Sequence, residues 1–174
     1  MNTIELHRIL SKAMKKCNFI GVFACDQLPL NATLSRPLAL VVNTDPSHQS
    51  GTHWLAVYID THNQASFFDS FGNPPDRFAK SIGKFLEANC NDVQYITRQV
   101  QSSCSAVCGQ HCVFFLLHMD KSEDYDALST KYKVNTHTND RMVCRFVKKL
   151  HPSVTCKSID NTNCIQCAVS FYNH

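Results

Sequence analysis

The sequence predicts an α+β domain in which a small mixed sheet packs against a buried central helix. Two patterns and the composition lead to this prediction. Short apolar runs of strand length alternate with polar turns through the first part of the chain. A later run is apolar on every side, which is typical of a helix inside a core. The 174 residues are 44% hydrophobic and 18% charged, which suits a single domain with a real core.

Helical spacing of apolar residues begins the chain. It runs through residues 4–16, and Asn2 or Thr3 can cap the first turn. Residues 19–25 then suit a short strand that a turn-prone stretch ends. Residues 38–42 suit a second strand, which is apolar on both faces and therefore expected inside the sheet.

The next two apolar runs are expected to pair as a hairpin. A polar loop at residues 43–52 leads into residues 53–60, which are apolar on both faces, and residues 66–69 follow a polar turn. Residues 78–88 have helical spacing. Residues 93–100 alternate loosely and suit a further strand.

The longest hydrophobic helix is expected at residues 105–119, with Ser105 as its cap. Residues 120–138 are polar and expected to be loop-rich. Residues 139–150 form an amphipathic helix. Its inward residues are Val143, Phe146, Val147 and Leu150, and its outward residues are Arg145, Lys148 and Lys149.

Composition and charge exclude several classes of protein. The apolar runs are too short to span a bilayer, and the N-terminus lacks the pattern of a signal peptide. We therefore expect an intracellular protein that is not secreted and whose ten cysteines are mostly free thiols. The net charge of +3 does not by itself indicate nucleic-acid binding. Residues 141–157 contain five Lys/Arg and no Asp/Glu. This basic stretch is interpreted either as the solvated face of a helix or as a patch that binds a polyanion.

One cysteine pair has the spacing of a metal ligand pair. Cys164 and Cys167 form a Cys-x-x-Cys, but the sequence supplies no second pair after it. A structural zinc site needs four ligands, so we expect no metal and interpret both as ordinary small residues.

Cys108 is the candidate nucleophile. It stands at the start of the predicted buried helix, where the helix dipole and unpaired N–H groups favour a thiolate. Gly109 would let a substrate or a neighbouring backbone approach closely. The alternative is that Cys108 is a buried core thiol, as Cys112 on the same helix is expected to be.

A nucleophilic cysteine needs a base, and the base needs an orienting group. His53 begins one strand of the hairpin and Asp69 ends the other, so the two can touch. We expect the carboxylate to accept the Nδ1–H of His53, which leaves Nε2 to face Cys108. Taken singly, His53 could be a structural residue and Asp69 a turn residue.

Acyl transfer also needs donors for the oxyanion. The backbone N–H of Cys108 is one candidate. A side-chain amide is the usual second donor, and either Gln101 or Gln99 could supply it.

These motifs together resemble the adenovirus-type cysteine proteases, which share a fold core with the ubiquitin-like-protein proteases. They are His-Trp at 53–54, an acid before Ser-Phe-Gly at 69–72, and Gln-x6-Cys-Gly at 101–109. The resemblance covers about residues 5–119 of a single domain spanning residues 1–174, and leaves residues 120–174 as an unassigned extension. It implies that His53 is the base, Asp69 its orienting acid, Cys108 the nucleophile and Gln101, over Gln99, the oxyanion amide.

The resemblance also implies a function. We expect an endopeptidase of a DNA virus, or of a virus-like element, that processes virion precursor proteins in the host nucleus and the virion. A narrow slot walled by Trp54 implies cleavage after Gly or another small residue. The chemistry needs no cofactor, and we expect a monomer.

The same resemblance suggests two activators. A short peptide could bind through a disulfide to Cys90, although Cys90 could equally be a packing residue at a helix end. DNA could bind the basic cluster, which consists of Arg141, Arg145, Lys148 and Lys149.

Two other functions stay open. The acid of the viral enzymes is usually Glu, whereas Asp69 matches the cellular branch and favours a deconjugating isopeptidase for ubiquitin-like modifiers. A non-catalytic, cysteine-rich module that binds metal or nucleic acid is the third interpretation.

Overall fold

The structure is a computed structural model that describes residues 1–30, 34–121 and 125–156. Its centre is a five-stranded sheet in the order β1-β2-β3-β4-β5. The outer pairs β1–β2 and β4–β5 are parallel, and the two inner pairs are antiparallel. The strands are β1 (Asn18–Ala24), β2 (Leu38–Asn43), β3 (Trp54–Ile59), β4 (Gln64–Phe68) and β5 (Asp92–Tyr95). The predicted α+β class and the mixed sheet are confirmed.

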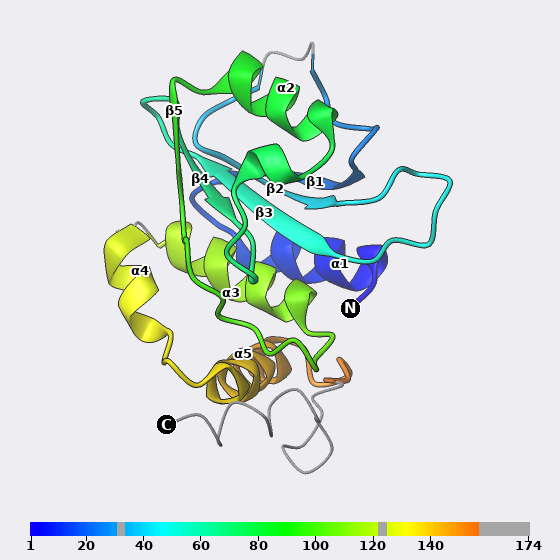
Figure 1. The fold of residues 1–174 in the computed structure, drawn as a ribbon, viewed down its shortest axis with the longest axis vertical. Coiled ribbons are helices and arrows are strands. Elements are labelled where there is room, and N and C mark those ends of the chain that lie inside the picture. The colour runs from blue at the N-terminus through cyan, green and yellow to red at the C-terminus, as the bar shows by residue number, and fades with distance from the viewer. Residues whose placement is uncertain (31–33, 122–124, 157–174) are drawn as a thin grey trace.

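Helices cover both faces of this sheet (Figure 1). Helices α1 and α3 lie on one face, α2 lies on the other, and α5 packs against the outer side of α3. The helices are α1 (Thr3–Ala13), α2 (Lys80–Asn89), α3 (Cys108–Met119), α4 (Tyr125–Lys131) and α5 (Thr136–Leu150), with a 3-10 turn at Pro75–Arg77. None of the helices in the described ranges is long and apolar enough to cross a membrane.

Strand residues alternate between two hydrophobic clusters, one on each face of the sheet. Val41 and Phe68 pack with α1, α3 and α5, whereas Leu40 and Phe67 pack with α2. All six residues of β2 are buried. The apolar pattern on both faces is therefore explained by helices on both sides.

Helix α3 is the centre of the larger cluster, and all twelve of its residues are buried. It begins at Cys108 rather than at the predicted Ser105, so the expected cap is wrong. The Ser105 hydroxyl instead donates to the Ser102 carbonyl, at 3.1 Å, in a turn before the helix. Val107 occupies the N-cap position and makes no side-chain cap. The first N–H groups of α3 are therefore left without a capping side chain.

Three further predictions of elements need correction. Residues 120–138 are not merely loop, because α4 forms within them and α5 begins at Thr136. Strand β5 ends at Tyr95, since the chain then leaves the sheet to meet Ser70, whose carbonyl accepts the Val100 N–H. Leu150 is 43% exposed and does not face the core, and it is the last residue of α5.

The two ends of the α1–α3 layer are held by side-chain hydrogen bonds. Asn2 caps α1 in a capping box with Glu5, which resolves the choice between Asn2 and Thr3. At the far end of α3, the Asp120 carboxylate accepts three backbone N–H groups from residues 15–17 at 2.8–3.0 Å. The segment after α1 is thus fastened to the C-terminus of α3.

Candidate active site

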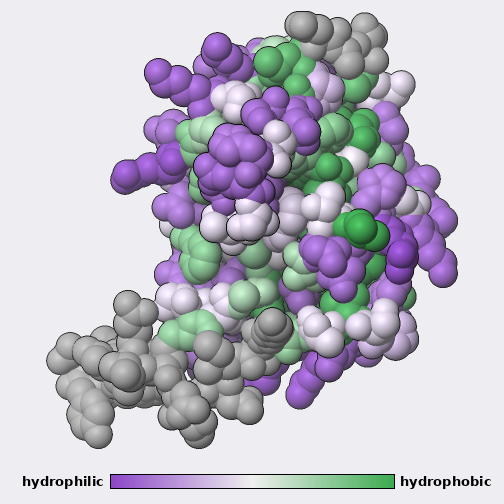
Figure 2. Space-filling view, turned by 90° about the vertical axis from the view of Figure 1, so that its right-hand side faces the viewer, coloured by the Kyte–Doolittle hydropathy of each residue, from purple (hydrophilic) through white to green (hydrophobic). Residues whose placement is uncertain are grey.

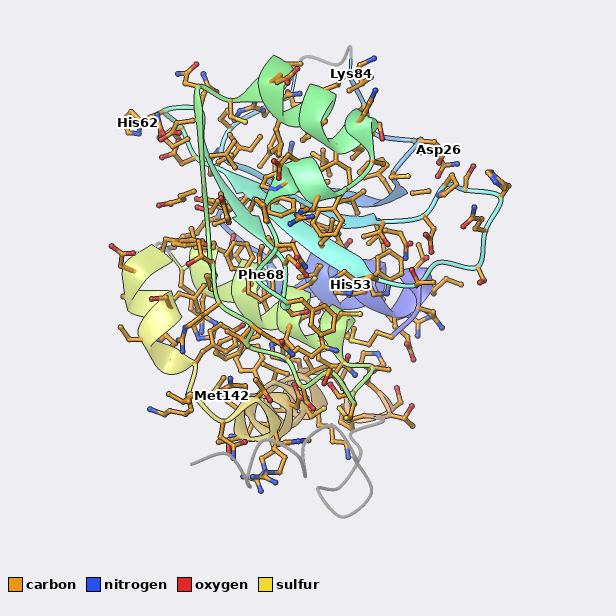
Figure 3. The ribbon with its side chains drawn as sticks, in the orientation of Figure 1. Asp26, His53, His62, Phe68, Lys84 and Met142 are labelled. Carbon is orange, nitrogen blue, oxygen red and sulfur yellow. The ribbon has the colours of Figure 1, made fainter. Side chains whose placement is uncertain are left out.

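His53 and Asp69 meet at one end of the β3–β4 hairpin. His53 immediately precedes β3, and Asp69 immediately follows β4. The strands pair antiparallel with Ala56 opposite Phe68, so the start of one lies beside the end of the other. His53 Nε2 lies 2.6 Å from Asp69 Oδ1, and the two side chains are 16% and 0% exposed. Figure 3 shows His53 at the start of β3, whereas His62 lies at the opposite end of the hairpin, in the turn between β3 and β4.

The imidazole ring has the opposite orientation from the expected one. Nε2, and not Nδ1, faces Asp69, so the expected Nδ1–H bond to the carboxylate is wrong. The Cys108 side chain is also a hydrogen-bond partner of His53, and Nδ1 is the nitrogen that remains for it. The His53 ring takes this orientation because of where the Cys108 sulfur lies. The sulfur accepts the Trp54 backbone N–H and is therefore beside the His53 main chain. The ring nitrogen nearer the main chain is Nδ1.

Asp69 is buried, and its carboxylate is fully occupied by donors. Besides His53, it accepts the Phe71 N–H at 3.1 Å, the Asn73 N–H at 3.0 Å and the Asn73 side-chain amide at 2.7 Å. Burial alone would raise the pKa of Asp69, but these hydrogen bonds and the His53 charge outweigh burial and lower it. The carboxylate therefore stays ionised beside the imidazole.

Cys108 is the first residue of α3 and is 9% exposed. Burial raises the pKa of its thiol, but the hydrogen bond and positive charge of His53 have the larger combined effect. The backbone N–H groups of Trp54 and Gly109 also stabilise the sulfur as an anion. The net result is a lowered pKa, which favours the thiolate.

Opposite forces act on His53. Burial lowers its pKa, whereas the bond to Asp69 and the interactions with Cys108 raise it, and the net value is about 9. An imidazolium between a carboxylate and a thiolate is therefore the favoured charge state near neutral pH. Cys112, by contrast, is fully buried, has a raised pKa, and donates its S–H to the Trp54 carbonyl. It is the core thiol that the sequence predicts.

Gln101 is buried and held by hydrogen bonds on its main chain and its side chain. Its Oε1 accepts the Ser70 hydroxyl at 2.7 Å, and one Nε2 hydrogen goes to the Ser105 carbonyl at 2.9 Å. The second amide hydrogen remains available to a substrate oxygen. Gln99 uses its own amide to bind the Gln101 carbonyl at 2.7 Å, and so serves to hold Gln101.

Trp54, the residue expected to wall a substrate slot, contacts the first residue of the chain and lines a cavity whose lining does not include His53 or Cys108. Its indole N–H donates to the Met1 carbonyl at 3.1 Å, and it lines a cavity of about 360 Å³ with Asn43, Asp45 and Gly51. A Cβ on Gly109 would lie 3.0 Å from Met1 Cβ and 3.4 Å from Trp54. The absence of a side chain at Gly109 thus lets Met1 and Trp54 pack close to the start of α3.

The sequence profile of the adenovirus endoprotease family matches residues 19–155. The chain belongs to this family. The match continues past residue 119, where the resemblance seen in the sequence ends, and includes the whole of α5.

Individual relatives agree with the family match. The protease of bovine adenovirus 7 is 30% identical over 172 residues, which cover 83% of this chain and 84% of the relative. The protease of ovine adenovirus D serotype 7 is 27% identical over 124 residues, covering 64% of this chain and 61% of the relative. The chain thus matches less than two thirds of the length of some relatives.

Solved structures share the fold at low sequence identity. A crystal structure of an ASFV protease has a TM-score of 0.55 at 16% identity, over 79% of this chain and 63% of that chain. The structure of ChlaDub1 from Chlamydia trachomatis has a TM-score of 0.51 at 18% identity, over 86% and 76%. The fold and the family are those of a viral cysteine protease.

The remaining candidate residues lie away from His53. Cys90 is the C-cap of α2, and its S–H donates to the Leu86 carbonyl at 2.8 Å. Burial raises the pKa of Cys90 to about 11, although Arg36 opposes this rise. The basic cluster is exposed along α5. Cys164 and Cys167 lie outside the described residues, and no cluster of three or more metal-binding side chains occurs within the described ranges.

Seven of the described cysteines are free thiols, which agrees with the expectation that most of them are free. Cys104 is an exception, since it is in a disulfide. The free thiols are Cys17, Cys25, Cys90, Cys108, Cys112, Cys144 and Cys156.

Sequence reasoning missed the residues that hold the acid and the amide. Ser70 and Asn73 flank the Asp69 turn and bind Gln101 and Asp69, respectively. A signal was present, because a Ser, an Asn and a Gly within four residues of Asp69 are typical of a tight, side-chain-bonded turn. Their partners, however, depend on how the hairpin meets the segment before α3.

Proposed function

We propose that this chain is a cysteine endopeptidase that cleaves viral precursor proteins after Gly or another small residue. One observation supports the proposal above all. His53 lies between a fully buried carboxylate, 2.6 Å away, and the Cys108 thiol at the start of a buried helix. This is the arrangement in which a thiolate is formed and kept ready to attack a carbonyl.

In the proposed mechanism, each step is carried out by a named group. The Cys108 thiolate attacks the scissile carbonyl carbon, and the electron pair of the C=O bond moves to oxygen. The oxyanion accepts N–H groups from Cys108 and the Gln101 amide. When the C–N bond breaks, the His53 imidazolium gives the Nδ1 proton to the leaving amine, and a thioester remains on Cys108.

The second half of the reaction reverses these roles. Neutral His53 takes a proton from water, and the resulting hydroxide attacks the thioester carbonyl. The C–S bond breaks, the acid product leaves, and the thiolate–imidazolium pair is restored. Asp69 stays ionised throughout and holds the ring by its Nε2–H.

The substrate class rests on the slot and on the family. Trp54 and the Met1 side chain lie close to Gly109, next to Cys108. We propose that Trp54 walls a slot too narrow for a large residue at the cut. The relatives are viral proteases, which favours virion precursor proteins as substrates and the host nucleus and virion as locations. We further propose that the enzyme acts as a monomer.

The test is cleavage of peptides that differ only in the residue before the cut. Wild-type protein should cleave after Gly and Ala and much more slowly after Leu, with the cut site mapped by mass spectrometry. The control is Cys108→Ala, which should abolish cleavage. Full activity in that variant would refute the assignment of the nucleophile.

A deconjugating activity is favoured by one feature, the aspartate at position 69 in place of glutamate. The same active site would then cut after the C-terminal glycine of a ubiquitin-like modifier. A modifier carrying a C-terminal electrophile separates the two substrates. Capture of Cys108 at low probe concentration, together with slow cleavage of precursor peptides, would favour the deconjugating isopeptidase.

The third interpretation, a non-catalytic binding module, makes a different prediction. Such a protein would bind metal through Cys164 and Cys167 and would not cleave peptides. Zinc content of the purified protein, in wild type and with both cysteines changed to Ser, decides between them. An enzyme that cleaves peptides without bound zinc would exclude the module.

Activation by a peptide is a further part of the proposal. Cys90 lines a cavity of about 530 Å³ between α2 and β5, with Pro74, Leu86 and Tyr95 among the lining residues. A cysteine-bearing peptide could lie there and form a disulfide. Non-reducing mass spectrometry should show a one-to-one adduct that Cys90→Ser loses and Cys17→Ser keeps. An adduct that persists in Cys90→Ser would refute this site.

Activation by DNA would use the opposite end of the molecule. The four side chains of the basic cluster are exposed on α5, which lies beyond α3 from the sheet (Figure 1). Reversal of two charges, Arg145→Glu with Lys149→Glu, should weaken DNA binding and reduce its dependence on salt. The matched control reverses Lys80 and Lys84 on α2. An equal loss in both variants would indicate only net charge.

A further inference from the structure

We propose that Asn139, Asp140 and His111 are positioning residues that fix the Gln101 amide relative to Cys108. The inference rests on the proposed protease function and names a part of the site that neither the motifs nor the family match assigns. All three side chains are essentially buried, with exposures of 0–1%. None of them contacts Cys108 in the manner of His53.

Asn139 and Asp140 bind the peptide groups on the two sides of Gln101. Asn139 Nδ2 donates to the Val100 carbonyl at 2.9 Å. Asp140 Oδ2 accepts the Ser102 N–H at 3.3 Å. Both residues lie in the first turns of α5, so a single rigid element holds the main chain before and after the oxyanion amide.

Asn139 is itself fixed, which makes it a precise support. Its Nδ2 also donates to the Lys133 carbonyl at 2.9 Å, and its Oδ1 accepts the Lys133 N–H at 2.7 Å. The side chain therefore bridges the turn before α5 and the segment before α3. Rotation of the amide would break three hydrogen bonds.

Asp140 also reaches the helix that carries the nucleophile. Its Oδ1 lies 2.9 Å from His111 Nε2, and His111 is three residues after Cys108 on α3. The His111 ring stacks on Tyr132 with centroids 5.7 Å apart, which fixes its plane. Asp140 thus joins the two parts of the site that must keep a fixed separation, the Gln101 segment and the start of α3.

The cost of this arrangement argues that it has a purpose beyond packing. A buried carboxylate loses its hydration, and such a pair is often no more stabilising than apolar residues of the same size. Helix α5 already packs on the larger hydrophobic cluster through Val143 and Val147. Preorganised oxyanion donors, in contrast, must not move as charge develops on the substrate.

A double-mutant cycle separates positioning from general stability. Asp140→Asn keeps the shape of the side chain and an acceptor for Ser102 but removes the charge. In the wild-type background we expect kcat to fall by about 10-fold or more with little change in KM, because an ill-placed oxyanion donor loses part of the roughly 10²–10³-fold that such a donor contributes. In a Gln101→Ala background the same change should alter kcat by less than about 2-fold.

Two further variants make the cycle decisive. Asn139→Asp is isosteric and removes the donor to Val100, so the same effects on kcat are expected from it as from Asp140→Asn. It replaces Asp140→Asn in the cycle if that variant fails to fold. Asp120→Asn changes another buried carboxylate that binds backbone N–H groups, at the opposite end of α3. Its effect on kcat, whatever its size, should be the same in both backgrounds.

The outcomes are distinct. The positioning role would be overturned if Asp140→Asn and Asn139→Asp lowered kcat equally in the wild-type and Gln101→Ala backgrounds. It would also be overturned if neither change lowered kcat. Either result would leave the protease assignment intact. Alkylation of Cys108 by iodoacetamide needs no oxyanion donor and should stay close to the wild-type rate in Asp140→Asn. A wild-type protein that neither cleaves peptides nor shows selective alkylation of Cys108 would overturn both proposals.

Discussion

The Ser70 hydroxyl donates a 2.7 Å hydrogen bond to Gln101 Oε1, and Ser70 follows Asp69 directly in the chain. The Ser70 carbonyl also accepts the N–H groups of Val100 and Gln101 at 2.9 and 3.0 Å. Asp69 and Gln101, the proposed acid and oxyanion amide, are therefore connected through one buried residue.

Removal of this hydroxyl should impair the chemistry more than the binding of substrate. Ser70→Ala leaves Gln101 Oε1 without its donor in a buried place, at a cost of about 1–3 kcal/mol in the free energy of unfolding. The amide then loses its fixed orientation, and we expect kcat to fall about 10-fold while KM changes little. Steady-state kinetics and thermal unfolding measure the two effects. A change confined to KM would contradict the proposed role of Gln101.

The pH dependence of alkylation should differ from that of cleavage. Because the pKa of Cys108 is lowered, we expect it to react faster than the other thiols at about pH 6, where ordinary thiols are protonated. Alkylation should not decline above pH 9, because the thiolate persists there. Cleavage should decline as pH passes about 9, because His53 then loses the proton that the leaving amine needs.

The protein supplies controls for this measurement. Burial raises the pKa of Cys17 to about 12 and that of Cys90 to about 11, so neither should react at about pH 6. Peptide mapping of the iodoacetamide label distinguishes the three sites. His53→Ala should abolish the selectivity for Cys108, and selective labelling in that variant would show that another group activates the thiol.

The length of the acid should matter as much as its charge. Asp69→Asn removes the charge that keeps His53 protonated, and we expect kcat to fall by about 10²–10⁴-fold. Asp69→Glu keeps the charge but adds a methylene in a fully buried turn whose donors, Phe71 and Asn73, are placed for the shorter side chain. We expect a loss of about 1–3 kcal/mol in the free energy of unfolding from overpacking. Unchanged stability and activity in Asp69→Glu would show that the turn adapts.

The glycine of the Asp69 turn should be intolerant of a side chain. Gly72 has φ +78°, and a Cβ there would lie 2.6 Å from the backbone carbon of Arg98. Gly72→Ala should therefore lower the free energy of unfolding by about 1–3 kcal/mol from backbone strain, with further loss from the clash. It should also reduce cleavage, because the turn carries Asp69.

Gly83 gives the matched control. It lies in α2, and a Cβ there would meet nothing within 4 Å. Gly83→Ala should raise the free energy of unfolding by about 0.5–1 kcal/mol, since alanine favours a helix. Equal behaviour of the two variants in denaturant unfolding would contradict the strain at Gly72.

Much of the site could be predicted because it depends on local pattern. Once residues 53–60 and 66–69 are recognised as a hairpin, antiparallel pairing brings His53 to Asp69. The apolar run from Cys108 similarly predicts a buried helix without any knowledge of its neighbours. The order of His, acid, Gln and Cys then supplies the family.

The rest depends on contacts between segments far apart in the sequence. The orientation of the His53 ring follows from where α3 places the Cys108 sulfur, and no pattern within the hairpin contains that information. Asp140 accepts the Ser102 N–H, although the two residues are 38 positions apart in the sequence. A polar residue in an amphipathic helix is expected on the solvated face, so its burial could not be foreseen.

The dependence of the Gln101 segment on α5 has a consequence during protein synthesis. A ribosome releases His53, Asp69, Gln101 and Cys108 before it releases Asn139 and Asp140. The nascent chain therefore carries all four proposed catalytic residues before the proposed support for Gln101 has been made. We therefore expect full cleavage activity to begin only after α5 has left the ribosome and folded onto α3.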